Sequence, residues 1–436
     1  MPVDWAAPRA KVISLGCRLN LAEGEAIRRG LEAAGGDAIV VNTCGVTNEA
    51  VRRSRQTIRR LRRENPTARL FATGCAAQMD PTGFAAMEEL TGVIGNDAKL
   101  KPETWSDILA APADGEPILR VDDIMSVRET APQLAPALGE RARAFLQVQN
   151  GCDHRCTFCA IPFGRGPARS TPIVDVLRQA RMLVAAGHDE LVVTGVDITS
   201  WGADLDGRPA LGDLIAALLD ETPGLVRLRL SSIDGAEIDD VLFERIAGDR
   251  RLAPYLHLSV QSGDDMILKR MKRRHRRGDV IRLVEELRTR RPELAVGADM
   301  IAGFPTETAG MFANSLALVD DAGINYLHVF PFSPRRGTPA ARMPQVDRLV
   351  VRQRAMQLRE KGEAATRAFL DHLIGLKCEA TIESGGVARL DNFAEVILTD
   401  PPAPVLIGRS RTVEIMDRKG LRLSGAIVAD RPVAAE

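Results

Sequence analysis

Three cysteines in one short segment are the residues of this chain best suited to bind a metal. Cys152, Cys156 and Cys159 follow a C-x3-C-x2-C spacing and are called the loop triad below. Closed structural zinc sites and ordinary iron–sulfur sites use four protein ligands, so three thiolates indicate a metal with an open position for a cofactor or substrate. The alternative is a zinc knuckle with His154 as its fourth ligand. His154 lies close to the cysteines in sequence, and no second C-x2-C pair is nearby.

Three further cysteines lie far apart in sequence but occupy equivalent positions. Cys17, Cys44 and Cys75, called the strand-end triad below, each follow a short apolar segment and precede a helical pattern. The predicted strands span 11–15, 38–42 and 69–73. The carboxyl ends of parallel strands share one edge of a sheet, and ligands bind at that edge. The pattern therefore predicts a second three-thiolate site, the alternative being three buried apolar residues without a ligand.

A second series of alternating strands and helices begins at residue 141 and must position the loop triad. Its predicted strands span 143–149, 190–195, 226–230, 256–260, 295–301 and 326–330. Its predicted helices span 172–186, 210–220, 237–247, 278–290 and 307–321. This series fits an incomplete parallel (βα)6 barrel whose active site lies at the carboxyl ends of the strands. The loop triad directly follows the first strand, so the metal belongs at that end.

The C-terminal part of the chain changes to short strands separated by turns. A long helical pattern over 347–373 leads to predicted strands at 377–383, 393–398, 404–406, 410–416 and 421–427. This pattern predicts a small β-barrel. We therefore expect an α/β protein with an N-terminal parallel domain, a partial barrel and a small β-barrel. The predicted limits are 9–125, a linker at 126–140, the barrel with its bridging helix at 141–373, and 376–432.

The composition of the chain says more about where the protein is located than about which partner it binds. Lys plus Arg equals Asp plus Glu at 58 each, but basic residues gather at 52–63 and 269–277. Such blocks suit contacts with nucleic-acid phosphates, although each can also be a solvated helix face. The chain starts without a signal-peptide pattern, and no apolar run approaches the ~20 residues of a membrane helix. We expect a cytoplasmic protein with free thiols and no membrane partner.

These motifs together resemble the radical-SAM superfamily and, within it, the methylthiotransferase family. The shared segments are 16–20, 42–44, 74–75, 151–159, 259–264, 271–274, 303–308 and 332–339. The resemblance implies two 4Fe–4S clusters and S-adenosylmethionine (SAM). It implies that the loop triad holds the cluster that cleaves SAM, and that the strand-end triad holds an auxiliary cluster carrying the sulfur. SAM would then serve both as methyl donor to sulfur and as radical source, chemistry that belongs to the cofactor.

The resemblance also implies other site residues and an RNA partner. Contacts with SAM are expected from Phe158, Gly195, Asp197, Ser231, Ser232, Gln261 and Phe304. The alternatives for any one of these are strand-end capping and core packing. Candidate substrate contacts are Arg165, Arg335 and Arg336, the last two beyond the final barrel strand. The C-terminal barrel is similar to the TRAM domain, an RNA-binding module of this family.

Within the family, segments 16–20 and 230–234 are most similar to the branch acting on threonylcarbamoyladenosine. This implies insertion of a methylthio group at C2 of that nucleoside at tRNA position 37, next to the anticodon. The implied partners are the anticodon stem-loop and an external electron donor, and the oligomeric state is not predicted. Alternatives are the isopentenyladenosine branch, the branch acting on a ribosomal-protein aspartate, and, in another class, a non-catalytic zinc RNA-binding protein.

Overall fold

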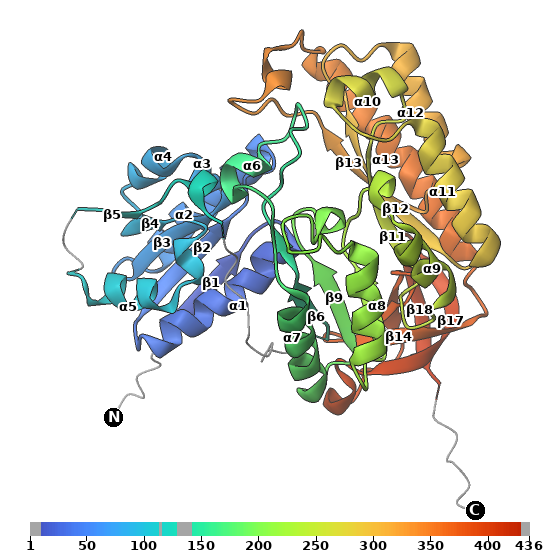
Figure 1. The fold of residues 1–436 in the computed structure, drawn as a ribbon, viewed down its shortest axis with the longest axis horizontal. Coiled ribbons are helices and arrows are strands. Elements are labelled where there is room, and N and C mark those ends of the chain that lie inside the picture. The colour runs from blue at the N-terminus through green and yellow to red at the C-terminus, as the bar shows by residue number, and fades with distance from the viewer. Residues whose placement is uncertain (1–9, 113–115, 129–141, 429–436) are drawn as a thin grey trace, which may run out of the picture.

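The computed structural model describes residues 10–112, 116–128 and 142–428 (Figure 1). Residues 129–140 of the predicted linker and 429–432 of the predicted last domain lie outside the described residues. The residue limits of the three domains stay a prediction. Along the described chain, a parallel α/β unit is followed by a partial barrel and then by a small β-barrel, which confirms the predicted fold class.

The N-terminal unit is a five-stranded parallel sheet between two helical layers. Its strands, in sheet order, are β1 (Ala10–Ser14), β2 (Ala38–Thr43), β3 (Arg69–Gly74), β4 (Gly92–Ile94) and β5 (Ile118–Arg120). Helices α1 (Arg18–Ala33) and α5 (Pro102–Ala110) pack on one face, and α2 (Asn48–Glu64), α3 (Cys75–Met79) and α4 (Pro81–Ala85) pack on the other. Helix α5 and the edge strand β5 lie in a part of the chain for which the sequence predicts no element.

The central unit has six parallel strands in an incomplete barrel, as predicted. They are β6 (Ala144–Gln147), β9 (Glu190–Thr194), β10 (Arg227–Leu230), β11 (Tyr255–Gln261), β12 (Ala295–Ala302) and β13 (Tyr326–Pro331). Two three-stranded sheets, β10-β9-β6 and β11-β12-β13, meet through isolated bridges from Leu228 to Leu252 and from Ile233 to Leu258. The edge strands β6 and β13 therefore border the open side of the barrel.

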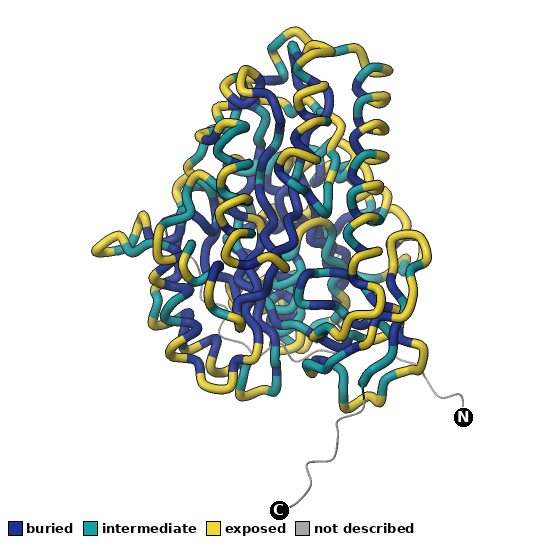
Figure 2. The backbone as a smooth tube through the Cα atoms, turned by 90° about the vertical axis from the view of Figure 1, so that its right-hand side faces the viewer, coloured by how far each residue is buried: buried dark blue, intermediate teal, exposed yellow. Residues whose placement is uncertain are grey.

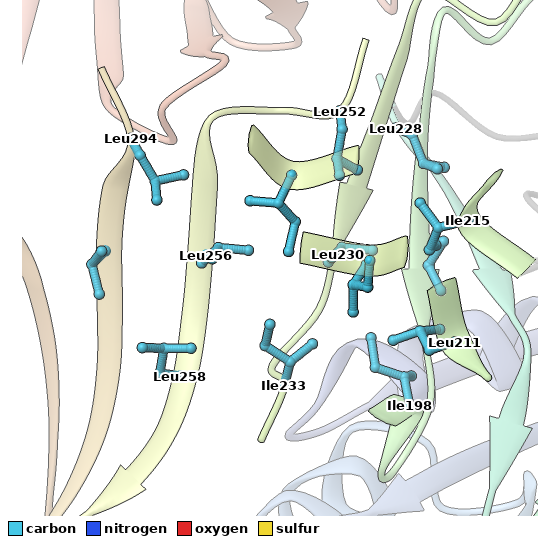
Figure 3. Packing of buried hydrophobic residues seen from close by; sticks show 14 of the residues in the cluster. Ile198, Leu211, Ile215, Leu228, Leu230, Ile233, Leu252, Leu256, Leu258 and Leu294 are labelled. Carbon is cyan, nitrogen blue, oxygen red and sulfur yellow. The ribbon is translucent and has the colours of Figure 1, made fainter. Parts of the chain in front are cut away.

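Helices cover the outer face of this barrel. They are α7 (Ile173–Ala185), α8 (Leu211–Glu221), α9 (Asp240–Gly248), α11 (Arg277–Arg290) and α12 (Ala309–Asp321). The main hydrophobic core lies between the strands and these helices, where side chains such as Leu228, Leu230 and Leu256 meet Leu211 and Ile215 (Figure 3). Strands β6 and β9 to β12 are mostly buried and the edge strand β13 is not, while the helices alternate between buried and exposed residues (Figure 2).

The inner face of the barrel is polar, and its interior is called the lumen below. Successive strand side chains point to opposite faces, so residues that alternate with the core leucines, valines and alanines face inward. These inward residues include Arg143, Gln147, Gln149, Glu190, Thr194, Arg229, Tyr255, His257, Gln261, Asp299 and His328. Complete barrels fill this space with branched apolar side chains. A polar lumen is suited to a polar ligand instead.

The C-terminal unit is a closed five-stranded barrel reached through α13 (Arg348–Asp371). Its strands are β14 (Lys377–Glu383), β15 (Val387–Leu390), β16 (Glu395–Leu398), β17 (Ser410–Lys419) and β18 (Arg422–Ile427). The predicted strand at 404–406 is wrong, because these residues form a 3-10 turn with Pro404 at its start. Proline has no N–H to donate to a strand ladder. Among the described helices, none is long and apolar enough to cross a membrane.

Candidate active site

The loop triad lies at the carboxyl end of β6, where the sequence predicts it. Its loop is fixed at several points by backbone hydrogen bonds. The Cys152 N–H donates to the Gly166 carbonyl at 3.1 Å, and the Thr157 N–H donates to the Met271 carbonyl at 3.1 Å. The Cys159 N–H closes a turn on the Cys156 carbonyl at 3.1 Å. The loop that carries the three thiols is therefore fixed by contacts within the protein.

A carboxylate from the next strand lies beside this triad. The Cys152 Sγ is 3.5 Å from Asp197 Oδ2, and His154 Nε2 is 2.9 Å from the same oxygen. Burial opposes a charge on Asp197, but the hydrogen bond and charge of His154 outweigh it and lower the pKa of the carboxyl. Asp197 is therefore ionised at neutral pH and can accept hydrogen bonds from an ammonium group. This is the chemistry expected of it toward SAM.

Gln149 fixes the backbone that carries this carboxylate. Its Oε1 accepts the Val196 N–H at 3.0 Å and the Asp197 N–H at 2.9 Å. A Cβ on Gly195 would lie 3.0 Å from the same oxygen, so a larger residue would displace Gln149. Gly195, a predicted site residue, is thus needed for the close approach of its segment to Gln149.

The spacing of the cysteines argues against the zinc-knuckle alternative. Among the described residues, the groups whose ligand atoms all lie within 4.8 Å of one another contain no cysteine, and His154 groups with Asp197 and Glu237. A single tetrahedral zinc with Zn–S bonds of about 2.3 Å would need sulfurs about 3.8 Å apart. In a 4Fe–4S cluster each cysteine binds a different iron, so wider spacing suits a cluster.

The strand-end triad is assembled from three strand ends, as the sequence predicts. Cys44 and Cys75 are buried and Cys17 is exposed. Burial, together with the nearby Cys75 and Cys17, raises the pKa of the Cys44 thiol to about 11. Gly16 has a φ of +91°, and a Cβ there would lie 2.6 Å from the Cys44 Sγ. Only glycine lets the chain pass this close to a thiol in that conformation.

A fully buried charge network adjoins Cys75. The Arg165 Nε donates to the Cys75 Sγ at 3.1 Å, while its other nitrogens pair with Glu23 and donate to Asn20 Oδ1 at 2.6 Å. Lys99 Nζ lies 2.6 Å from Glu23 Oε2. Two cations share one carboxylate, so the network carries excess positive charge beside Cys75. Arg165, predicted to contact the substrate, is instead buried against the strand-end triad.

Packing between two helices connects the triads. Helix α6 (Ile161–Arg165) begins two residues after Cys159 and packs on α3, which begins at Cys75 (Figure 1). A Cβ on Gly164 would lie 3.3 Å from the Cys75 Cα. The segment that ends the loop triad is therefore packed directly on the helix that carries one member of the strand-end triad.

The loop after β13 provides a second link between the two units. Arg335 Nη1 donates to Asn48 Oδ1 at 2.6 Å, and the Asn48 N–H donates to the Ser333 Oγ at 3.2 Å. Arg336 is exposed. Of the two predicted substrate arginines in this loop, Arg335 thus bridges the N-terminal unit and the barrel, whereas Arg336 is open to solvent.

The remaining predicted SAM contacts are two aromatic residues in an apolar cluster and three polar residues at strand ends. Phe158 and Phe304 share a small apolar cluster near the loop triad with Met271. Ser231 is buried and its Oγ has no hydrogen-bond partner among the described residues, whereas Ser232 is exposed. Gln261 ends β11 with a φ of +71°, an uncommon conformation for a residue other than glycine.

Sequence reasoning missed several residues of this site. Arg273 Nη1 lies 3.7 Å from the Cys156 Sγ, and its Nη2 is 2.8 Å from Asp234 Oδ2. Arg273 therefore belongs to a buried ion pair rather than to a free basic surface. The signal for Gln149 is present in the first barrel strand, where Arg143, Gln147 and Gln149 alternate with apolar residues. That alternation indicates a strand facing a polar lumen.

Comparison with known proteins agrees with this geometry. The Radical SAM superfamily matches residues 146–319, and the uncharacterized protein family UPF0004 matches residues 9–95. The threonylcarbamoyladenosine tRNA methylthiotransferase MtaB of Rickettsia prowazekii (strain Madrid E) is 48% identical over 391 residues, covering 89% of this chain and 91% of that protein. The chain belongs to the radical-SAM methylthiotransferase family. The predicted family is confirmed.

Other similarities extend over most of the methylthiotransferase chain. A Bacillus subtilis (strain 168) protein also named threonylcarbamoyladenosine tRNA methylthiotransferase MtaB is 37% identical, covering 79% of this chain and 78% of that protein. The radical S-adenosylmethionine methyltransferase TsrM from Kitasatospora setae has the same fold, with a TM-score of 0.54, 14% identity and coverage of 77% and 75%. As a member of this family, the protein is an enzyme that transfers methylthio groups and uses SAM and a 4Fe–4S cluster.

Proposed function

We propose that this enzyme inserts a methylthio group at C2 of threonylcarbamoyladenosine in tRNA, at position 37 next to the anticodon. The observation that carries the chemistry is the pairing of two three-thiol sites through α6 and α3. The choice of nucleoside rests on the 48% identity to the Rickettsia prowazekii protein, whose name states that substrate.

We assign the loop triad to one 4Fe–4S cluster and the strand-end triad to a second. When bound, the first supplies the electron that cleaves SAM and the second supplies the sulfur. The residues of the chain hold and surround these groups. Arg273 and Arg165 donate to Cys156 and Cys75, and such hydrogen bonds to sulfur tune iron–sulfur sites. We assign Asp197 to accept the SAM amino group, and Phe158 and Phe304 to exclude water.

The substrate side of the proposal is a tRNA anticodon stem-loop, with an external electron donor. The C-terminal β-barrel is suited to RNA as a TRAM-like module. Exposed Arg336 at the barrel mouth is suited to a backbone phosphate, because such contacts position RNA without reading its sequence. The loop around Arg335 would place this contact beside Asn48 of the N-terminal unit.

Nucleoside analysis of tRNA tests the proposal. A strain lacking this gene should keep threonylcarbamoyladenosine and lose its 2-methylthio form, and the wild-type gene should restore it. Complementation with Cys152→Ala or Cys17→Ala should fail. Retention of the 2-methylthio nucleoside in the deletion strain would contradict the proposed substrate.

The isopentenyladenosine branch is the nearest rival. A Novosphingobium aromaticivorans protein named tRNA-2-methylthio-N(6)-dimethylallyladenosine synthase is 34% identical, covering 87% of this chain and 88% of that protein. The same nucleoside analysis separates the two branches, since loss of 2-methylthio-isopentenyladenosine alone would favour the rival.

A further inference from the structure

One arginine of the N-terminal unit extends into the lumen at the amino ends of the barrel strands, where the C-terminal β-barrel packs. Arg18 directly follows Cys17 and begins helix α1, which packs against β6 at the open side of the barrel. Its Cζ lies 5.4 Å from the centre of the Phe393 ring, which comes from the C-terminal β-barrel. Three units of the molecule therefore meet at this guanidinium.

Four guanidinium groups surround the Phe393 ring, and only Arg18 among them lacks an anionic partner within the described residues. The other three lie 5.2–5.9 Å from the ring centre and are Arg143, Arg229 and Arg389. Their carboxylate contacts are Arg143 to Glu383 at 2.7 Å, Arg229 to Glu190 at 2.8 Å and Arg389 to Glu383 at 3.1 Å. Arg18 is half-buried without such a contact. A half-buried guanidinium with no carboxylate of the described chain in contact leaves room for an anionic ligand, so this position favours one.

The aromatic residue that Arg18 contacts, Phe393, has a strained backbone conformation. Phe393 has a φ of +76°, a region that non-glycine residues rarely adopt. Its ring stacks on Tyr255, with centroids 4.7 Å apart and planes 14° apart. The Tyr255 hydroxyl in turn lies 2.9 Å from His257 Nδ1 on the inner face of β11. Strained positions of this kind concentrate at functional sites.

Other polar groups in the lumen have no hydrogen-bond partner within the described part of the chain, and they indicate a polar ligand. Gln147 is 3% exposed and faces the lumen from β6, yet neither its Nε2 nor its Oε1 has a partner among the described residues. The Tyr326 hydroxyl, on the opposite edge strand, is also unpaired. Buried polar groups are normally hydrogen-bonded, so an amide and a hydroxyl left open here suit a ligand with its own donors and acceptors.

We propose that Arg18 is the receptor for a carboxylate carried by the substrate nucleoside, with the Phe393–Tyr255 stack as its floor. This inference rests on the proposed function and names the residue that selects the substrate. The ligand class is an adenosine whose N6 substituent ends in an amino-acid carboxylate. Arginine pairs with carboxylates through two parallel hydrogen bonds. An apolar N6 substituent would leave Arg18 unpaired in the lumen, so the residue both attracts one substrate and rejects the other.

Arg335 and Arg336 are less suited to this task. Arg335 already donates to Asn48, and Arg336 is exposed beyond the barrel. A phosphate contact from Arg336 would strengthen RNA binding without regard to the N6 substituent. Arg336→Gln is therefore the matched control, since it also removes one positive charge.

The test measures binding of the full-length holoenzyme to three anticodon stem-loops. One carries threonylcarbamoyladenosine, one carries its carboxylate methyl ester, and one carries unmodified adenosine. Wild-type protein should bind the free acid at least about tenfold more tightly than the ester, as expected for a buried charged hydrogen bond. Arg18→Gln should remove this preference and leave binding of the unmodified RNA unchanged, whereas Arg336→Gln should weaken all three equally.

Two outcomes would overturn the inference. Equal binding of acid and ester by the wild-type protein does so without any variant, and so does an Arg18→Gln protein that keeps the wild-type preference. Arg18→Lys, which retains the charge, should keep part of the preference. Loss of threonylcarbamoyladenosine methylthiolation in the wild-type protein is a different result, since it contradicts the proposed function itself.

Discussion

At the scale of single residues, Gly16 offers a local test of the strand-end triad. Gly16→Ala places a methyl group 2.6 Å from the Cys44 Sγ at a φ of +91° and should displace that thiol. Reconstituted protein is expected to fall from about eight irons per chain to about four, because one of the two proposed 4Fe–4S clusters is lost. Gly35→Ala is the matched control, with a φ of +63° but no atom within 4 Å. Equal iron loss in both variants would contradict the assignment.

The buried pair of Arg165 and Glu23 predicts a strong energetic coupling. Arg165→Met leaves Glu23 with Lys99 alone and should lower the free energy of unfolding by about 3–5 kcal/mol, the usual effect of breaking a buried ion pair. Denaturant unfolding of both single variants and of Arg165→Met with Glu23→Gln measures the coupling. Strictly additive changes would show that the two side chains do not support each other.

Local sequence patterns predict the positions of the cysteines but not the role of Arg165. The positions of the six cysteines after strand ends could be predicted, because their spacing and their position after apolar segments are local patterns. Arg165 was interpreted as a substrate contact, since its partner Glu23 lies 142 positions away in the sequence. The link from Lys99 to Glu23 spans 76 positions. The first contact depends on the docking of two units and the second on packing within the N-terminal unit, and neither has a local signal.

At the scale of elements, periodicity predicts the long helices and central strands well. Periodicity does not predict elements whose structure depends on contacts with distant parts of the chain. Strands β4 and β5 have three residues each and were not predicted, because strands this short are specified by their pairing partners. The basic segment at 269–277 was considered as an RNA surface, but Arg273 pairs with Asp234 and Arg277 with Asp321. Charge runs alone cannot distinguish these roles.

The junction between barrel strand β9 and the C-terminal β-barrel predicts a pH dependence. Glu190 is fully buried, which opposes its charge, but Arg229 and Arg143 together with the Thr381 hydroxyl outweigh burial and lower its pKa to about 2. A carboxyl with a lowered folded-state pKa stabilises the fold above its unfolded pKa, and this stability is lost as pH falls from about 4.5 toward 2.

The size of this effect can be measured by comparing unfolding curves across that pH range. The lowered pKa corresponds to a stabilisation on the order of 3 kcal/mol at neutral pH. Glu190→Gln should be less stable than wild type at pH 7, and its stability should change less between pH 4.5 and 3. Parallel pH profiles for the two proteins would contradict this origin of the acid sensitivity.

At the scale of the whole molecule, three units enclose one polar lumen. The N-terminal unit lies against the open side of the barrel, and the C-terminal β-barrel meets the amino ends of the strands (Figure 1). Arg229 of β10 donates to the Asp391 carbonyl at 2.8 Å, and Thr381 of β14 donates to Glu190 at 2.7 Å. The order of the three units was predicted from sequence. Their mutual packing, which places Arg18 and Phe393 in the lumen, was not.

The most direct test of this account separates its two metal sites. A variant with Cys17, Cys44 and Cys75 all changed to Ala should retain about four irons per chain and continue to cleave SAM, while forming no 2-methylthio nucleoside on tRNA. The matched variant with the loop triad changed to Ala should also retain about four irons but lose both activities. Loss of SAM cleavage in folded protein lacking only the strand-end triad would contradict two separate clusters with divided roles.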